Sequence, residues 1–326
     1  MKIFTNPNYN FIRWRWHAIA LSLVIIGAGA AMLVVRGLPL GIDFSGGTLV
    51  IVQFEQPVTE DQVRSAIENV IPGEEVVQQY GSATDRQMLV RLPQTEQAEQ
   101  GTSLEQGAVQ IRQALEKGGL PKFEVISTEV VGPVIGADLQ RRGVYATLAS
   151  LLAITIYIGF RFRFSFAVGA IAATLHDVFV TLAFLAFFGY DLSLNVVAAL
   201  LTITGYSVND TIVIFDRVRE NLRTKRREPL EKVVNDSVNQ TLSRTIITAG
   251  TTFLSVLALF IFGGEVLRGF AFTMLVGIVS GTYSTIFIAS SIAILLSQRR
   301  HAAVAATTAP AATPRSGRKS GRARAS

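Results

Sequence analysis

The chain has 326 residues, of which 49% are hydrophobic and 17% are charged, and its formal net charge is +6. This balance places it among membrane proteins. Cysteine is absent, which excludes disulfides, a thiol nucleophile and a thiolate metal site. Residues 36–142 hold 9 Lys/Arg against 15 Asp/Glu, whereas the rest of the chain holds 21 against 9. Because the basic residues flank apolar spans, they indicate membrane topology and contact with anionic lipid rather than nucleic acid.

The first 35 residues predict a cytoplasmic N-terminus at 1–17 and a first transmembrane helix at 18–35. Basic residues and two tryptophans suited to a membrane interface precede the apolar run. The alternative is a cleaved signal peptide, because a basic start, an apolar stretch and small residues are its ingredients. A transmembrane helix is favoured, since the run approaches the roughly 20 residues that cross a bilayer.

Residues 36–142 predict an extracytoplasmic α+β domain with flanking linkers. Alternating or β-rich runs predict strands at 48–55, 75–80, 87–92 and 122–131. Apolar positions at helical spacing predict helices at 59–70 and 103–117. The resulting order β-α-β-β-α-β is that of a ferredoxin-like module.

Residues 143–298 predict a region of five further transmembrane helices, so the fold class is an α-helical polytopic membrane protein with six spans. The five apolar segments are 144–160, 165–188, 193–221, 245–262 and 269–296. A basic cytoplasmic loop is expected at 217–244, and its second part predicts an amphipathic helix from Pro229 that lies along the membrane surface. Residues 299–326 predict a disordered basic cytoplasmic tail.

The distribution of Lys and Arg predicts the orientation of the chain. With six spans, the N-terminus, the two basic loops and the C-terminus all fall on one side. The short turns on the opposite side carry only Arg268. Because cytoplasmic segments are enriched in Lys and Arg, both termini are expected in the cytoplasm and residues 36–142 outside a cytoplasmic membrane.

Asp210 is the first candidate for a functional residue, because it lies within an apolar helix. An ionisable group at that depth costs roughly 2.5–3.5 kcal/mol, so it normally faces a partner or a water-filled path. Arg244 opens the next span and is expected near the same level, where its approach or withdrawal would change the affinity of Asp210 for a proton. The pair therefore predicts a proton path. The alternatives are a purely structural polar contact for Asp210 and a plain interface charge for Arg244.

His176 and Asp177 form a second intramembrane polar site. No carboxylate cluster surrounds His176 at ligand spacing, so helix packing is favoured over metal binding and no metal or cofactor is expected. An aspartyl protease dyad of Asp177 with Asp210 would need two carboxylates at close range, whereas these two are expected at different depths. Ser207, Asn209 and Thr248 are expected to support the polar pathway.

Small residues indicate where helices pack closely, although they are common in any transmembrane bundle. Gly277 and Gly281 form a GxxxG pattern on the sixth span. The stretch GIDFSGGT at 41–48 is not an ATP-binding loop, since it opens a strand on the outer side.

Five motifs are specific enough to show a resemblance that covers Arg13 to Leu296. They are GIDFSGGT at 41–48, LHD at 175–177, GYSVNDTIVIFDRVREN at 205–221, SRTIITAGTT at 243–252 and FGGEVLRGF at 262–270. With them the chain resembles the SecF family of protein-export membrane proteins. The resemblance implies half of a resistance-nodulation-division (RND) type bundle. It assigns Asp210 and Arg244 to a proton path, and Gly41, Asp43, Gly46 and Gly47 to a family motif turn.

The expected function is that of a non-enzymatic subunit of an accessory complex driven by the proton motive force. The resemblance implies that this complex promotes preprotein translocation across, and release from, the membrane. The implied partners are SecD, the SecYEG channel, the translocating preprotein and the lipid bilayer, with YajC and YidC as further candidates and no nucleic acid. Two alternatives are a passive scaffold that stabilises the translocon and an RND-type subunit for efflux of small molecules.

Overall fold

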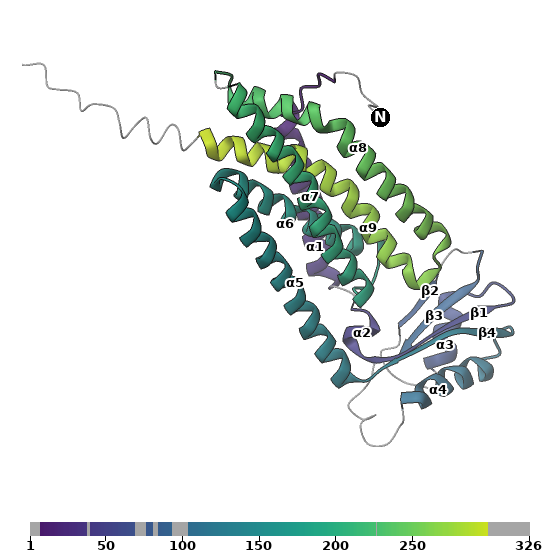
Figure 1. Cartoon of the computed structure of the whole chain (residues 1–326). Helices are drawn as coiled ribbons and strands as arrows, with labels where there is room; N and C mark the ends of the chain where they lie inside the picture. The colour runs from purple at the N-terminus through teal and green to yellow at the C-terminus, as the bar shows by residue number, and fades with distance from the viewer. Residues whose placement is uncertain are drawn as a thin grey trace, which may run out of the picture.

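The computed structural model describes residues 7–37, 40–68, 76–80, 84–92, 104–225 and 227–298. The basic tail predicted at 299–326 lies outside these residues. Figure 1 shows a bundle of long helices with a small sheet domain at one end and the N-terminus at the other. We call the end that lies away from the sheet the basic end, because the Arg-rich connections lie there.

Six helices of the described chain are long and apolar enough to cross a membrane, as predicted. Their bounds are α1 Arg15–Arg36, preceded by the short η1 Ile12–Trp14, α5 Pro133–Arg161, α6 Phe164–Phe188, α7 Leu194–Thr224, α8 Leu230–Phe262 and α9 Glu265–Ser284. Helix α9 continues through a π-helical stretch, Thr285–Ala289, to residue 298. Helices α7 and α9 pack closely, since a Cβ added at Gly277 would come 2.2 Å from the Ile203 side chain. The GxxxG pattern thus permits close helix packing.

The sheet domain confirms the predicted β-α-β-β-α-β order. The strands are β1 Gly47–Phe54, β2 Val76–Tyr80, β3 Gln87–Leu92 and β4 Phe123–Val131, in the antiparallel order β2-β3-β1-β4. Helices α3 (Glu60–Glu68) and α4 (Leu104–Lys117) cover one face and share its core with Val50, Val52 and Phe54. On the other face, α2 (Ile42–Ser45) adds Ile42 to Leu49, Ile51 and Leu89. Strand β1 is therefore buried on both faces.

Two sequence expectations about connections are wrong. The chain becomes helical at Pro133, so residues 133–142 begin α5 instead of forming a linker. The basic loop is also shorter than expected, because α7 runs to Thr224, while the helix expected from Pro229 begins at Leu230 as α8. Only residues 225–229 connect the two helices.

The apolar face of the helix after Pro229 packs against α7. Val234 and Val238 are buried against Phe215 and Val218 of α7. No proline or glycine interrupts residues 230–249, so α8 continues without a break into its apolar half. The periodic pattern was interpreted correctly as a helix, but its apolar face packs against protein instead of lipid.

Candidate functional site

Asp210 is a buried carboxylate without a fixed hydrogen-bond donor on one of its oxygens. It lies on α7 and is 4% exposed, and its Oδ2 atom accepts no hydrogen bond from the described residues. Arg244 on α8 attracts it electrostatically but does not bond to this oxygen. A buried oxygen without a hydrogen bond is energetically unfavourable unless a proton, a water or a cation binds it. The structure thus places the two predicted proton-path residues within range of one another.

Tyr206 is a neighbour of Asp210 that sequence reasoning missed. It lies one helical turn earlier on α7 and interacts electrostatically with Asp210, and its hydroxyl faces Thr252 of α8. The sequence signal that could have identified Tyr206 was its spacing of four residues from Asp210, because residues four apart share a helix face. A phenol in this position adds a polar group to the same face as the carboxylate.

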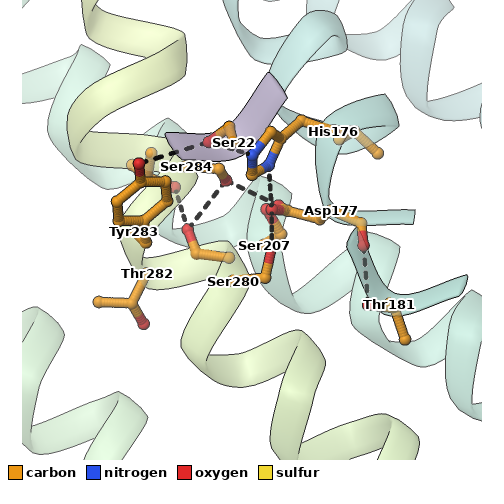
Figure 2. A network of polar contacts seen from close by, with 12 residues as sticks. Ser22, His176, Asp177, Thr181, Ser207, Ser280, Thr282, Tyr283 and Ser284 are labelled. Atoms are coloured by element: carbon orange, nitrogen blue, oxygen red, sulfur yellow. Dashed lines mark hydrogen bonds and ion pairs between the residues drawn. The ribbon is translucent and has the colours of Figure 1, made fainter. Parts of the chain in front are cut away.

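Asp177, unlike Asp210, is a carboxylate whose two oxygens are surrounded by hydrogen-bond donors (Figure 2). It is 0% exposed, and its Oδ1 accepts from Ser280 Oγ at 2.7 Å and from His176 Nδ1 at 3.1 Å. Its Oδ2 accepts from Ser207 Oγ at 2.5 Å and from Ser284 Oγ at 2.7 Å. We call these five residues the Asp177 cage. Its donors come from α6, α7 and α9, so the cage ties three helices together.

His176 extends the cage to α1. Its Nε2 lies 2.8 Å from Ser22 Oγ, and its ring stacks on Tyr283, whose hydroxyl donates to the carbonyl of Ala18 at 2.6 Å. The contact with Asp177 fits a proton on Nδ1 that is donated to the carboxylate. Across the described residues no group of three or more His, Cys, Asp or Glu side chains could hold a metal ion. Through Ser22 and Tyr283, His176 connects α6 to α1 and α9.

The expected supporting residues do not gather at Asp210. Ser207 donates to Asp177, and Thr248 donates to the carbonyl of Arg244 at 3.0 Å. Asn209 is exposed on α7. Asp177 and Asp210 therefore belong to separate polar sites, as their different depths predict. A contribution of Asn209 or Thr248 to proton movement stays a prediction.

An exposed polar stripe runs along α7 and α8 beside Asp210. Its members are Thr202, Asn209, Arg244, Thr251 and Ser255. Polar side chains are unfavourable against hydrocarbon, and helix–helix interfaces in membranes use small and hydroxylated residues. This face is suited to a partner helix or to a water-filled path rather than to lipid.

The family motif turn joins the sheet domain to the start of α7. The Gly41 N–H donates to the Leu192 carbonyl at 2.8 Å, and a Cβ at Gly41 would lie 3.0 Å from that oxygen. Asp43 Oδ2 accepts from the N–H of Leu194, the first residue of α7, at 2.8 Å. A carboxylate at a helix N-terminus is favourable for the orphan N–H groups and for the helix dipole.

The glycines of this motif allow its sharp reversal. Gly46 and Gly47 have φ values of 69° and 116°, which residues with a side chain rarely adopt. They end α2 and send the chain directly into β1. The N-terminus of the helix that carries Asp210 is thereby connected to the central strand of the sheet.

A second connection between the sheet and the bundle is made by Arg91 of β3. Its guanidinium pairs with Asp191 in the turn between α6 and α7, and it donates to the Leu40 carbonyl at 2.8 Å. Burial raises the pKa of Asp191, and the nearby Arg91 partly opposes this rise. Arg91 therefore favours the charged form of this half-buried carboxylate.

We expect Arg91→Gln to loosen the sheet domain from the bundle, because the Asp191 carboxylate loses its ion pair and its pKa rises further. Hydrogen exchange at residues 189–193 should become faster, and so should proteolysis near residue 40. The matched control is Arg112→Gln, which removes an exposed ion pair with Glu116 on α4 and should change neither rate. Equal protection in both variants would show that the Arg91 pair does not hold the domains together.

Comparisons with known proteins agree with this geometry. Residues 110–299 match the family model for the protein-export membrane protein SecD/SecF, C-terminal, and residues 31–58 match that for the SecD/SecF GG motif. The chain is 44% identical to the protein translocase subunit SecF of Desulfurispirillum indicum, over 86% of this chain and 89% of that protein. It is 40% identical to the subunit of the same name from Escherichia coli O157:H7, over 90% and 89%.

The fold is also similar to a solved structure. The crystal structure of SecDF, a translocon-associated membrane protein from Thermus thermophilus, matches with a TM-score of 0.80 and 37% identity. The match covers 90% of this chain but 39% of that chain. This chain thus spans about two fifths of the solved protein.

Proposed function

Because the chain belongs to the SecF family of protein translocase subunits, we propose that it couples proton movement to protein export. In this proposal, protons pass Asp210 and Arg244 down the proton motive force across the cytoplasmic membrane. The resulting movement of the sheet domain promotes translocation of a preprotein from the SecYEG channel and its release. YajC and YidC are further candidate partners.

The observation that carries the proposal is the contrast between the two buried carboxylates. Asp177 accepts four hydrogen bonds, whereas Oδ2 of Asp210 accepts none. A carboxylate oxygen without fixed donors can exchange a proton as its charged partner moves. One proton crossing 100 mV releases about 2.3 kcal/mol, which is comparable to typical couplings between sites.

The conformational change would pass from Asp210 to the sheet domain along α7. Protonation changes the attraction between Asp210 and Arg244, and so the position of α7 relative to α8. The first N–H of α7 is bonded to Asp43, and the motif turn leads directly into β1. A shift or rotation of α7 would thus reach β1, a central strand of the sheet, through the hydrogen bond to Asp43 and the short motif turn that follows it.

The proposed partner for the exposed polar stripe is SecD. A second six-helix half would cover Asn209, Arg244 and Thr251, which lipid would leave poorly solvated. The similarity to SecDF supports this assignment, because the matched part is less than half of that chain. In the proposed orientation both termini are cytoplasmic and residues 36–142 lie outside, as the Lys and Arg distribution favours.

The test is preprotein release from vesicles that contain SecYEG, SecD and this chain, with and without an imposed proton gradient. Release should be faster with the gradient, and an ionophore that dissipates it should abolish the increase. A passive scaffold would give the same stimulation in both conditions. That outcome would refute the coupling and favour the scaffold.

A further inference from the structure

A basic cavity lies at the basic end of the bundle, beyond Asp210 along α7. It has a volume of about 490 Å³ and is formed where α5 ends, α6 begins and α7 leaves the apolar region. Four arginines line it, namely Arg161, Arg163, Arg219 and Arg223. Among the described residues its lining contains no Asp or Glu. Neither the cage nor the proposed proton path uses this cavity.

The charge of the cavity is only partly compensated. Arg161 is held by Asp216, with 2.7 Å from one guanidinium nitrogen to each carboxylate oxygen. Arg163 and Arg219 are exposed side chains that line the same space. Positive groups that converge on one concave site attract an anion more strongly than scattered surface charges do.

The wall of the cavity is aromatic. Phe215 is buried and makes edge-to-face contacts with Phe162 at 5.8 Å and Phe166 at 5.0 Å between ring centroids. The Arg161 guanidinium lies 5.2 Å from the centre of the Phe162 ring. The arginines therefore form one side of the site and an apolar surface forms the other.

This apolar surface continues outward to the lipid-facing side of the bundle. Phe160, at the end of α5, is 91% exposed, and Phe164, at the start of α6, is 71% exposed. A neighbouring cavity of about 780 Å³ shares Arg163, Phe166 and Leu222 with the basic one, and its lining also contains Phe164, Leu230 and the carboxylate Glu228. The apolar surface beside the arginines is therefore formed by Phe164, Phe166 and Leu222.

We propose that this cavity binds the headgroup of an anionic phospholipid, with an acyl chain along Phe160 and Phe164. A phosphate diester matches the forked donors of arginine. The site lies at the basic end of the bundle, at the level where headgroups surround a transmembrane protein, and basic pockets between helices there are suited to such lipids. A free phosphate would satisfy the arginines but would leave the aromatic surface unused. The ligand class is thus a charged lipid.

The experiment uses the full-length protein in detergent, titrated with phosphatidylglycerol, phosphatidylethanolamine or glycerol 3-phosphate and followed by native mass spectrometry. Phosphatidylglycerol should bind tightest. In Arg163→Gln/Arg219→Gln its affinity should fall by at least about tenfold, since each of the two basic residues near a lipid headgroup contributes about fivefold. The matched control is Arg13→Gln/Arg227→Gln, which removes the same charge outside this cavity and should retain the affinity.

Three outcomes would overturn the proposal. They are equal loss of binding in both double variants, unchanged binding in Arg163→Gln/Arg219→Gln, and binding of glycerol 3-phosphate as tight as that of the lipid. Circular dichroism of each variant separates lost binding from lost folding. If the double variant does not fold, Arg163→Lys/Arg219→Lys replaces it. That variant should keep part of the affinity, because lysine retains the charge but not the forked geometry.

Discussion

Replacing Asp210 with asparagine is expected to abolish the gradient-dependent part of preprotein release. The amide has nearly the shape of the carboxylate but cannot bind or lose a proton in the accessible pH range. The buried Oδ2 has no hydrogen bond to lose, so the thermal midpoint and SecD binding should stay close to those of the unmodified chain. Release assays in vesicles with an imposed gradient measure the functional effect directly.

The matched control for this prediction is Glu220→Gln. It makes the same chemical change on the same helix, but at an exposed residue paired with Arg217 near the basic end. It should leave gradient-dependent release unchanged. If Asp210→Asn and Glu220→Gln respond equally to the gradient, Asp210 is a structural residue and the coupling proposal fails at its central point.

Replacing Asp177 with alanine is expected to cause the largest loss of stability. Three serine hydroxyls and one imidazole N–H lose their common acceptor in a buried site. A buried donor without an acceptor costs about 1–3 kcal/mol, so a loss of at least about 3 kcal/mol is expected even after partial rearrangement. Thermal unfolding in detergent measures this change as a lower midpoint.

The control for the cage is Asp138→Ala on α5. Asp138 is exposed and pairs with Arg142 one turn away, so its removal should change stability by less than about 1 kcal/mol. If Asp177→Ala unfolds at the same temperature as this control but loses gradient-dependent release, the cage is part of the proton path. That result would contradict the distinction between an anchoring and a proton-exchanging carboxylate.

Most of the architecture was predictable because each element has its own local signal. Apolar runs of membrane length gave the six helices, and alternation with turn residues gave the four strands in their correct order. The connection at 217–244 was not predictable in the same way. A run of charges and a periodic helix suit both a surface loop and the buried end of two long helices, and only tertiary packing of Val234 and Val238 decides between them.

The candidate site was only partly predictable for a related reason. Asp210 and Asp177 were conspicuous because a charge in an apolar helix has a high energetic cost. The donors of the cage were not conspicuous in the sequence. Ser280 and Ser284 are ordinary residues for a transmembrane helix, and their acceptor lies on another helix, α6. Sequence identifies the costly group, whereas the fold identifies what compensates it.

The π-helical stretch after Ser284 divides α9 into two rotational frames. The Ser290 Oγ hydroxyl donates to the Thr285 carbonyl five residues earlier, and the π-helical stretch accommodates one extra residue in the turn. That residue turns everything after it by about 100°, the angle per residue of an α-helix. Before the stretch, Ser284 faces the cage; at its end, the Ala289 carbonyl lies 2.5 Å from where a Gly169 Cβ would be. Deleting one residue from this stretch would rotate the residues after it, so the contact of Ser284 with the cage and that of Ala289 with Gly169 could not both form. The length of the stretch is thus more tightly constrained than its composition.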